Sequence, residues 1–366
     1  MKTLVVCGSR ADWGAANAIY ELLPEPKKIT NPNDLDIHPF IWLGGIKSYC
    51  PDLAIVVGDR FEVLRATVEL YIAGCCIAHV SGGDITEGSA DDSMRHAISK
   101  LSHIHFPSNQ NSARRLVQLG EQPNRIHVVG CPSTPAKMLT QPSNDFLLVV
   151  WHPNTLAGAT ENMREVEALT SALDEINIKK TVIGPNADEG NELIRQHMLS
   201  WTGRSKNTYV DTLSRPAYLD LLQNCAALIG NSSSGLYEAP SYGTPVVNIG
   251  DRQLGRITPK NVVNCTNVSV PDIISSIQFA LKRGRVATSN PYGDGAAAQR
   301  IADIISKIDD PKKLLRKKWH DLPVQSSNRR NGTMGKQKLW SSPSEIPASD
   351  PVAGNGEAKR TTYTGL

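Results

Sequence analysis

The chain has 366 residues, which is more than one average domain and enough for two, and 40% of them are hydrophobic. No apolar run approaches the roughly 20 residues of a membrane-spanning helix, and seven scattered cysteines argue against a disulfide framework or a metal site. The net charge of +3 comes from residues 311–366, which carry +7, so the first 310 residues carry −4. Neither a membrane nor a nucleic-acid partner is expected.

Short apolar runs alternate with helical stretches in residues 1–143. Residues 3–7, 53–57 and a run from residue 77 are predicted to be buried parallel strands, and 125–129 is strand-like. Helices are expected up to residue 23, over 63–73 and in the segment around Asp91, with a proline-rich loop over 24–39. Because the first strand starts at residue 3, we expect no leader peptide and a soluble cytoplasmic protein with reduced thiols.

The same alternation continues after a Pro/Ser-rich linker at 132–144. Strands are predicted at 146–150, 180–183, 208–210, 227–229 and 245–249, and helices at 161–176, 188–199, 215–224 and 295–307. Such alternation implies parallel sheets with right-handed crossovers. We therefore predict an α/β protein of two Rossmann-like doubly wound domains, 1–143 and 144–310, with a central cleft. Residues 311–366 are predicted to be a disordered basic tail.

The segment Ile77–Phe106 is the first candidate site. It begins as a strand, turns at Gly82-Gly83 and becomes a helix that carries Arg95. A strand that ends in a Gly-rich loop before a helix is where open α/β sheets bind ligands. Four carboxylates lie within nine residues there: Asp84, Glu87, Asp91 and Asp92. They indicate either a site in which acidic groups act together or a solvated loop at a helix N-terminus.

Other strand ends carry further candidates. Asp59-Arg60 follows the second strand, where Asp59 is either functional or a helix N-cap. Gly230–Gly235 holds three serines and suits a phosphate; Glu238 could accept from ribose hydroxyls, and Arg252 could pair with a phosphate. A Ser-rich turn with Glu238 as a helix charge is the alternative. His152 is either an acid/base group or a structural histidine.

These residues lie in motifs that resemble the UDP-N-acetylglucosamine 2-epimerases, and specifically their hydrolysing branch, which supplies N-acetylmannosamine for sialic-acid synthesis. The motifs occur in the same order and cover nearly all of residues 1–315. They are G-S-R-A-D-W at 8–13, G-D-R-F-E at 58–62, the block H-V-S-G-G-D through K-L-S-H at 79–103, W-H-P-N-T at 151–155, G-N-S-S-S-G-L-Y-E-A at 230–239, G-T-P-V-V-N-I-G-D-R-Q-L-G-R at 243–256 and N-P-Y-G-D-G at 290–295.

The resemblance implies two Rossmann-like domains in a GT-B-like arrangement, a UDP-sugar substrate and a homo-oligomer, dimer or tetramer, without metal or cofactor. Its chemistry would remove the proton on sugar carbon 2, release UDP to leave a 2-acetamidoglucal, and add water to give N-acetylmannosamine. The catalytic positions that it implies are Asp59, Asp84, Asp91, Asp92, Arg95 and His152. The positions that it implies for UDP binding are Arg10, Arg60, Leu213, Ser232, Ser233, Glu238 and Arg252.

Two departures from the family pattern accompany this match. Position 81 is Ser, where similar enzymes tend to carry Glu or His, so one polar catalytic role is vacant unless Asp84 partly replaces it. Only about fifty residues separate Gly8 from Gly58, where relatives have several tens more. The alternatives are therefore the same chemistry on a UDP-diacetamido sugar of the legionaminic-acid route, or a UDP-sugar-binding protein that has lost catalysis.

Overall fold

The computed structural model of the chain describes residues 1–8, 10–23, 27–28, 51–138 and 146–322. The expectations for most of the 24–39 loop, for the end of the 132–144 linker and for residues 323–366 lie outside these residues. The described helices and strands alternate along the chain, and both sheets are parallel throughout, which confirms the α/β prediction. None of the described helices is long and apolar enough to cross a membrane.

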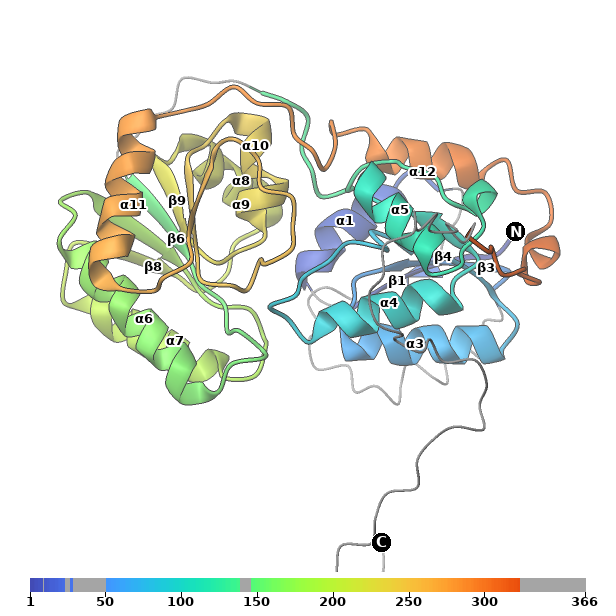
Figure 1. Cartoon of the computed structure of the whole chain (residues 1–366), viewed down its shortest axis with the longest axis horizontal. Helices are drawn as coiled ribbons and strands as arrows, with labels where there is room; N and C mark the ends of the chain where they lie inside the picture. Colours follow the sequence, from blue (N-terminus) through green and yellow to red (C-terminus); the bar gives the residue numbers. More distant parts are fainter. Residues whose placement is uncertain (9, 24–26, 29–50, 139–145, 323–366) are drawn as a thin grey trace, which may run out of the picture. The chain divides into compact units, whose positions relative to one another are not determined.

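The first sheet has the strand order β2-β1-β3-β4-β5. Its strands are β1 (Thr3–Cys7), β2 (Lys27–Lys28), β3 (Leu53–Val57), β4 (Cys76–Val80) and β5 (Ile104–Phe106). Its helices are α1 (Arg10–Tyr20), α3 (Phe61–Ile72), α4 (Asp91–Leu101) and α5 (Gln110–Gln118). Figure 1 shows α3 and α4 covering one face of this sheet. The other face packs against α1 and the late helix α12 (Ala297–Ile305) in one apolar core.

The second sheet has the strand order β11-β10-β9-β6-β7-β8. Its strands are β6 (Phe146–Val150), β7 (Lys179–Ile183), β8 (Thr208–Val210), β9 (Ala227–Gly230), β10 (Val246–Ile249) and β11 (Val262–Cys265). Helices α6 (Ala159–Asp174), α7 (Asn191–Gly203) and α11 (Val270–Arg283) contribute to the core on one face. Helices α8 (Arg215–Asn224), α9 (Ser234–Tyr237) and α10 (Ala239–Tyr242) contribute to the core on the other.

Several predicted elements are wrong in detail. Residues 125–129 form no strand, because a 3₁₀ turn at Pro123–Arg125 leaves only a single bridge between Ile126 and His105. The segment around Glu238 forms two short helices, α9 and α10, since Pro240 lacks the N–H that would continue α9. The loop over 24–39 contains the strand β2, and α7 begins three residues later than expected. Strand β11 and helix α11 were not predicted at all.

The division into domains at 143/144 stays a prediction, because residues Met1–Leu322 group into one compact unit. Helix α12 packs on α1 in the core of the first sheet, although the predicted boundary assigns it to the second domain. The six cysteines among the described residues are buried free thiols.

The first residues of the predicted disordered tail are ordered, which corrects that prediction for residues 311–322. A 3₁₀ helix covers Pro311–Leu314, and Arg125 donates to the backbone oxygens of Leu314 and Arg316 at 2.6 and 2.9 Å. The Lys317 ammonium lies 2.8 Å from a carboxylate oxygen of Glu121, which is 1% exposed. The composition of the whole tail obscured this short ordered part, here called the C-terminal strap (residues 311–322).

Glu121 joins the strap to the first sheet. Its carboxylate contacts Lys100 at 2.8 Å and His105 at 3.0 Å, besides Lys317. Burial by itself raises the pKa of Glu121, but the hydrogen bonds with His105, Lys100 and Lys317 outweigh it and lower the pKa to about 2. The ionised form is therefore favoured in the folded state. This contribution to stability is present above the ordinary pKa of 4.5 and is lost as the pH falls toward 2.

We expect Glu121→Gln to lower the free energy of unfolding at pH 7 by about 2–3 kcal/mol. The substitution removes the buried negative charge that Lys100, His105 and Lys317 contact. The difference from the wild type should shrink between pH 4.5 and pH 2, where Glu121 itself becomes protonated. Denaturant titrations at pH 7 and pH 3 measure both values. An equal deficit at the two pH values would contradict the assignment.

Ser81 directly follows the strand β4 and has an uncommon backbone conformation. Among the described residues it is the non-glycine residue with a left-handed φ, at 61°. Two residues later Gly83 has a φ of +79°, and a methyl group there would overlap the backbone oxygen of Ser112. The turn after β4 thus demands glycine-like backbone at two positions, and only one of them has glycine.

Ser81→Gly should raise the free energy of unfolding by about 0.5–1 kcal/mol, because glycine adopts the left-handed region without steric cost. Gly83→Ala is the matched contrast and should lower it by more than about 1 kcal/mol. Urea unfolding of the two variants beside the wild type gives the comparison. A destabilised Ser81→Gly protein would show that the serine side chain stabilises the turn.

Candidate functional site

The candidate residues lie where parallel strands of both sheets end. Asp59 follows β3, and the Gly82-Gly83 turn follows β4. His152 follows β6, and Arg252 follows β10. The carboxyl ends of parallel strands leave loops whose backbone and side chains point at a ligand, so this is the expected edge for a site.

Arg95 on α4 organises the acidic part of the site. Its guanidinium is buried and donates through Nε to Asp59 Oδ2 at 2.9 Å, with a second N–H on the same oxygen. Its Nη1 donates to Asp92 Oδ1 and to the backbone oxygen of Asp84, both at 3.1 Å. Burial raises the pKa of Asp59, but the charge and hydrogen bonds of Arg95 outweigh this effect and lower the pKa overall. Arg60, and not Asp59, is the N-cap residue of α3, so the capping alternative for Asp59 falls away.

Asp91 and Asp92 begin α4 in different surroundings. Asp92 accepts from the backbone N–H of Thr86 at 2.5 Å and lies 3.4 Å from His96 Nε2. Asp91 accepts from Ser89 Oγ at 3.2 Å. Burial and the nearby charges of Asp59 and Asp188 raise the pKa of Asp91. The site therefore holds one carboxylate with a lowered pKa, Asp59, beside one with a raised pKa, Asp91, which is an arrangement that separates acid and base roles.

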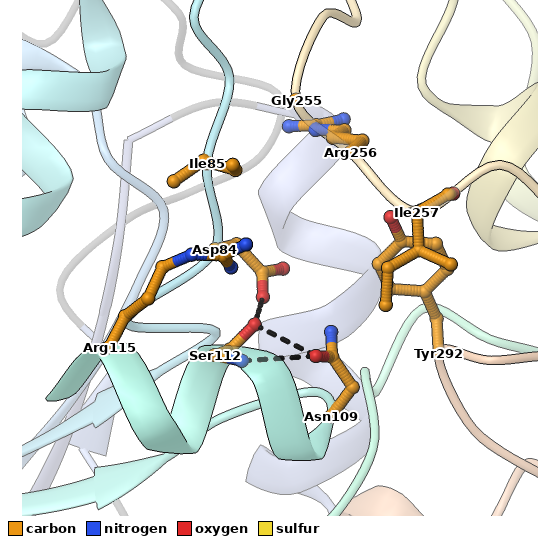
Figure 2. A pocket seen from close by; sticks show the side chains of 9 residues that line it. All are labelled: Asp84, Ile85, Asn109, Ser112, Arg115, Gly255, Arg256, Ile257 and Tyr292. Carbon is orange, nitrogen blue, oxygen red and sulfur yellow. Dashed lines mark hydrogen bonds between the residues drawn. The ribbon is translucent and has the colours of Figure 1, made fainter. Parts of the chain in front are cut away.

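Asp84 is enclosed by hydroxyl groups. Its Oδ1 accepts from Ser108 at 2.7 Å and from Ser112, and its Oδ2 accepts from Tyr237 at 2.6 Å. These donors contact both oxygens and join the loop after β4 to α9. Figure 2 shows Asp84 and Ser112 directed at each other, with Asn109 beside them. The small pocket drawn there is lined by Asp84, Ile85, Asn109, Ser112, Arg115, Gly255, Arg256, Ile257 and Tyr292.

His152 has a defined tautomer. Its Nδ1 accepts from the backbone N–H of Asn186 at 3.1 Å, and therefore the neutral ring carries its proton on Nε2. Burial, with a further effect from the Arg252 charge, lowers the pKa of His152 to about 3. The ring is neutral at physiological pH and offers an N–H donor, so it is poorly suited to deliver a proton from an imidazolium.

The predicted UDP-binding residues lie at several places in the structure. Ser232 and Ser233 follow β9, and Ser232 Oγ lies 3.2 Å from Ser234 Oγ. The buried Glu238 accepts from Arg215 Nη1 at 3.3 Å, and burial raises its pKa although Arg215 opposes this. Leu213 is half-buried in the loop between β8 and α8, outside the hydrogen-bonded cluster. Arg10 begins α1, and its side chain lies outside the described part.

Arg60 and Arg252 approach the same carboxylate from different sheets. Arg60 Nη1 donates to Asp188 Oδ1, and Arg252 Nη2 lies 3.6 Å from Asp188 Oδ2. Asp188 stands in the loop after β7, and its side chain is 6% exposed. Sequence reasoning missed it by assigning it to a helix start, although the position after a predicted strand at 180–183 was a usable signal.

Two more arginines were missed. Arg215 reaches Glu238 from α8, and Gly14 leaves room for its side chain, because a Cβ there would lie 2.7 Å from Arg215 Cδ. Arg256 donates to Thr86 Oγ1 at 3.2 Å and lies over the Tyr237 ring at 5.0 Å. Among the described residues no group of three or more His, Cys, Asp or Glu side chains is arranged to hold a metal ion.

Comparison with known proteins gives the family. A family model described as UDP-N-acetylglucosamine 2-epimerase matches residues 44–306. The hydrolysing UDP-N,N'-diacetylbacillosamine 2-epimerase of Legionella pneumophila is 30% identical over 285 residues, 74% of this chain and 75% of its own length. The UDP-N-acetylglucosamine 2-epimerase of Neisseria meningitidis is 30% identical over 289 residues, with 74% and 75% covered.

Solved structures similar to this chain include enzymes of the same name. A crystal structure of the Neisseria meningitidis UDP-GlcNAc 2-epimerase bound to UDP-GlcNAc superposes with a TM-score of 0.67 at 16% identity, covering 84% of this chain and all of that one. This likeness extends over both sheets and supports the GT-B-like fold class. From the match over most of its length, the chain belongs to the UDP-N-acetylglucosamine 2-epimerase family.

Proposed function

We propose that the protein is a hydrolysing UDP-N-acetylglucosamine 2-epimerase, which converts UDP-N-acetylglucosamine and water to UDP and N-acetylmannosamine, a precursor for sialic-acid-type sugars. The observation that carries the proposal is the pair Asp59 and Asp91, whose pKa values are moved in opposite directions at one strand edge. Loss of a weakly acidic C–H proton needs a positioned base with a pKa nearer to neutral, and Asp91 is the carboxylate that fits.

The proposed reaction has two stages. Asp91 takes the proton from carbon 2 while the bond between carbon 1 and the diphosphate breaks, leaving a double bond between carbons 1 and 2. Water then adds its oxygen to carbon 1, and a proton returns to carbon 2 from the opposite face. Arg95 and Asp92 fix the geometry of the carboxylates around the sugar, since Arg95 contacts Asp59, Asp92 and the backbone of Asp84.

Departure of UDP needs positive charge and N–H donors at the diphosphate. Arg60 and Arg252 supply two guanidinium groups, and Ser232 and Ser233 supply hydroxyls after β9. The neutral His152 contributes its Nε2–H as a donor to a developing oxyanion, which is consistent with its lowered pKa. Glu238 is assigned to the ribose hydroxyls, and Leu213 and Arg10 remain in the proposed UDP set.

A second substrate follows from one observation. The relative at 30% identity from Legionella pneumophila is named for a diacetamido sugar, at the same identity as the relative named for UDP-N-acetylglucosamine. The same elimination and hydration on a UDP-diacetamido sugar is therefore the alternative, with identical roles for the carboxylates. The Ser81 departure, with no acidic side chain at that position, supports the third possibility, UDP-sugar binding without turnover.

Incubation with UDP-N-acetylglucosamine in D₂O should release UDP and N-acetylmannosamine that carries deuterium at carbon 2, because the returning proton comes from solvent. Proton NMR follows both products and the deuterium content in one sample. A parallel incubation with the diacetamido nucleotide sugar identifies the preferred substrate. UDP binding with turnover of neither sugar would overturn the enzyme proposal.

Asp91→Asn should lower kcat by about 10²- to 10⁴-fold, because the amide cannot accept the carbon-2 proton. UDP affinity should stay within about threefold of wild type. In the wild type the acid limb of kcat/KM should lie above the ordinary carboxylate pKa of 3.8, since Asp91 has to be ionised and its pKa is raised. Asp220→Asn on the exposed surface of α8 is the control. Undiminished turnover by Asp91→Asn would show that Asp91 is not the base.

A further inference from the structure

The loop after β7, residues 184–190, contacts three of the proposed site residues although the family motifs quoted above do not include it. Asn186 binds the ring of His152 through its backbone N–H, and Asp188 contacts both Arg60 and Arg252. Arg60 belongs to the end of β3 in the first sheet, whereas Arg252 follows β10 in the second. One short loop thus links candidate groups from both sheets.

Both the side chain and the backbone oxygen of Asp188 accept hydrogen bonds. Asn186 Nδ2 donates to its Oδ2 at 2.5 Å, while Oδ1 accepts from Arg60. Its backbone oxygen accepts from the N–H and from the side-chain amide of Asn191, at 3.1 and 2.7 Å, which fixes the turn into α7. A carboxylate that is 6% exposed and fixed at both its backbone and its side chain is a rigid anchor for flexible cations.

The two arginines keep donors free for a ligand while they contact Asp188. Arg60 contacts Asp188 through Nη1 and Glu62 through Nε and Nη2. Arg252 donates to the backbone oxygens of Pro153 and Asn231 at 3.1 and 3.3 Å. A guanidinium has five N–H groups, and these hydrogen bonds use three of them on Arg60 and two on Arg252, whose Nη2 lies 3.6 Å from Asp188 Oδ2. At least two N–H groups on each side chain remain for phosphate oxygens.

We propose that Asp188 is a positioning residue, which holds the Arg60 and Arg252 guanidiniums together so that both reach the diphosphate of the nucleotide sugar. This inference rests on the proposed function, because it assumes a diphosphate ligand at these arginines. Without the carboxylate between them, the two cations repel each other and each long side chain regains rotamer freedom that binding then has to remove. Asp188 therefore acts on the ligand through the arginines and does not touch it.

The test measures UDP affinity by isothermal titration calorimetry, independently of turnover. Asp188→Asn keeps the shape but removes the charge, and should weaken UDP binding about tenfold. Asp188→Glu keeps the charge on a longer side chain and should lose less UDP affinity than Asp188→Asn. Asp220→Asn, an exposed carboxylate on α8, should bind as wild type. Circular dichroism and thermal unfolding confirm that each variant is folded.

A double-mutant cycle separates positioning from general structural damage. If Asp188 acts through the arginines, Asp188→Asn should weaken UDP affinity by less than twofold in a protein that already carries Arg60→Ala and Arg252→Ala. A full tenfold loss in that background, or unchanged UDP binding by Asp188→Asn alone, would overturn the inference. Tighter binding would also overturn it, because Asp188 would then compete with the diphosphate.

UDP binding by the wild type distinguishes failure of the proposed function from failure of the role proposed for Asp188. A wild-type protein that binds no UDP refutes the assignment of the nucleotide site itself. A wild type that binds UDP and an Asp188→Asn variant that binds it equally well refute only the role of Asp188. Loss of UDP affinity in Asp188→Asn with the expected non-additivity supports the inference even if no sugar is turned over.

Discussion

The buried guanidinium of Arg95 is the interaction on which the acidic site depends. Carboxylates gathered at one strand edge repel each other, and a single planar cation with several donors compensates them by contacting Asp59, Asp92 and the backbone of Asp84 together. Arg95 donates to Asp59 and lowers its pKa, whereas burial and the negative charges of Asp59 and Asp188 raise the pKa of Asp91. The different character of the two carboxylates thus follows from which of them the arginine reaches.

Hydroxyl groups and backbone amides fix other polar side chains of the site without adding charge. Tyr237 donates to Asp84 across the junction between loops of the two sheets, and Asn186 fixes the ring of His152. Neither contact adds charge, yet each determines which atoms of its partner remain for a ligand. Preorganised polar groups of this kind need little rearrangement when charge develops during a reaction.

The sequence was sufficient for strands such as 3–7 and 53–57, because these runs are continuously apolar and buried. It also located Asp59 at a strand end and Asp91 and Arg95 in the helix after the Gly82-Gly83 turn, since these positions follow from the alternation of strands and helices. It did not single out Asp188, although this residue follows a predicted strand, because its contact with Arg60 joins positions 128 residues apart. Nor did it separate the strap from the rest of the tail, because Glu121, Arg125 and the core on which Leu314 and Leu315 pack are far from the strap in the sequence.

The strap also defines where the folded chain can be cut. Trp319 stacks on Gly120, where any side chain would overlap the indole, and it covers the Lys100 ammonium at 4.1 Å. A shortened protein that stops at the last apolar helix, α12, would expose Glu121 and leave His105 and Lys100 as its partners without Lys317. A boundary chosen from hydrophobicity alone would therefore remove the contacts that the strap makes with Glu121 and Arg125.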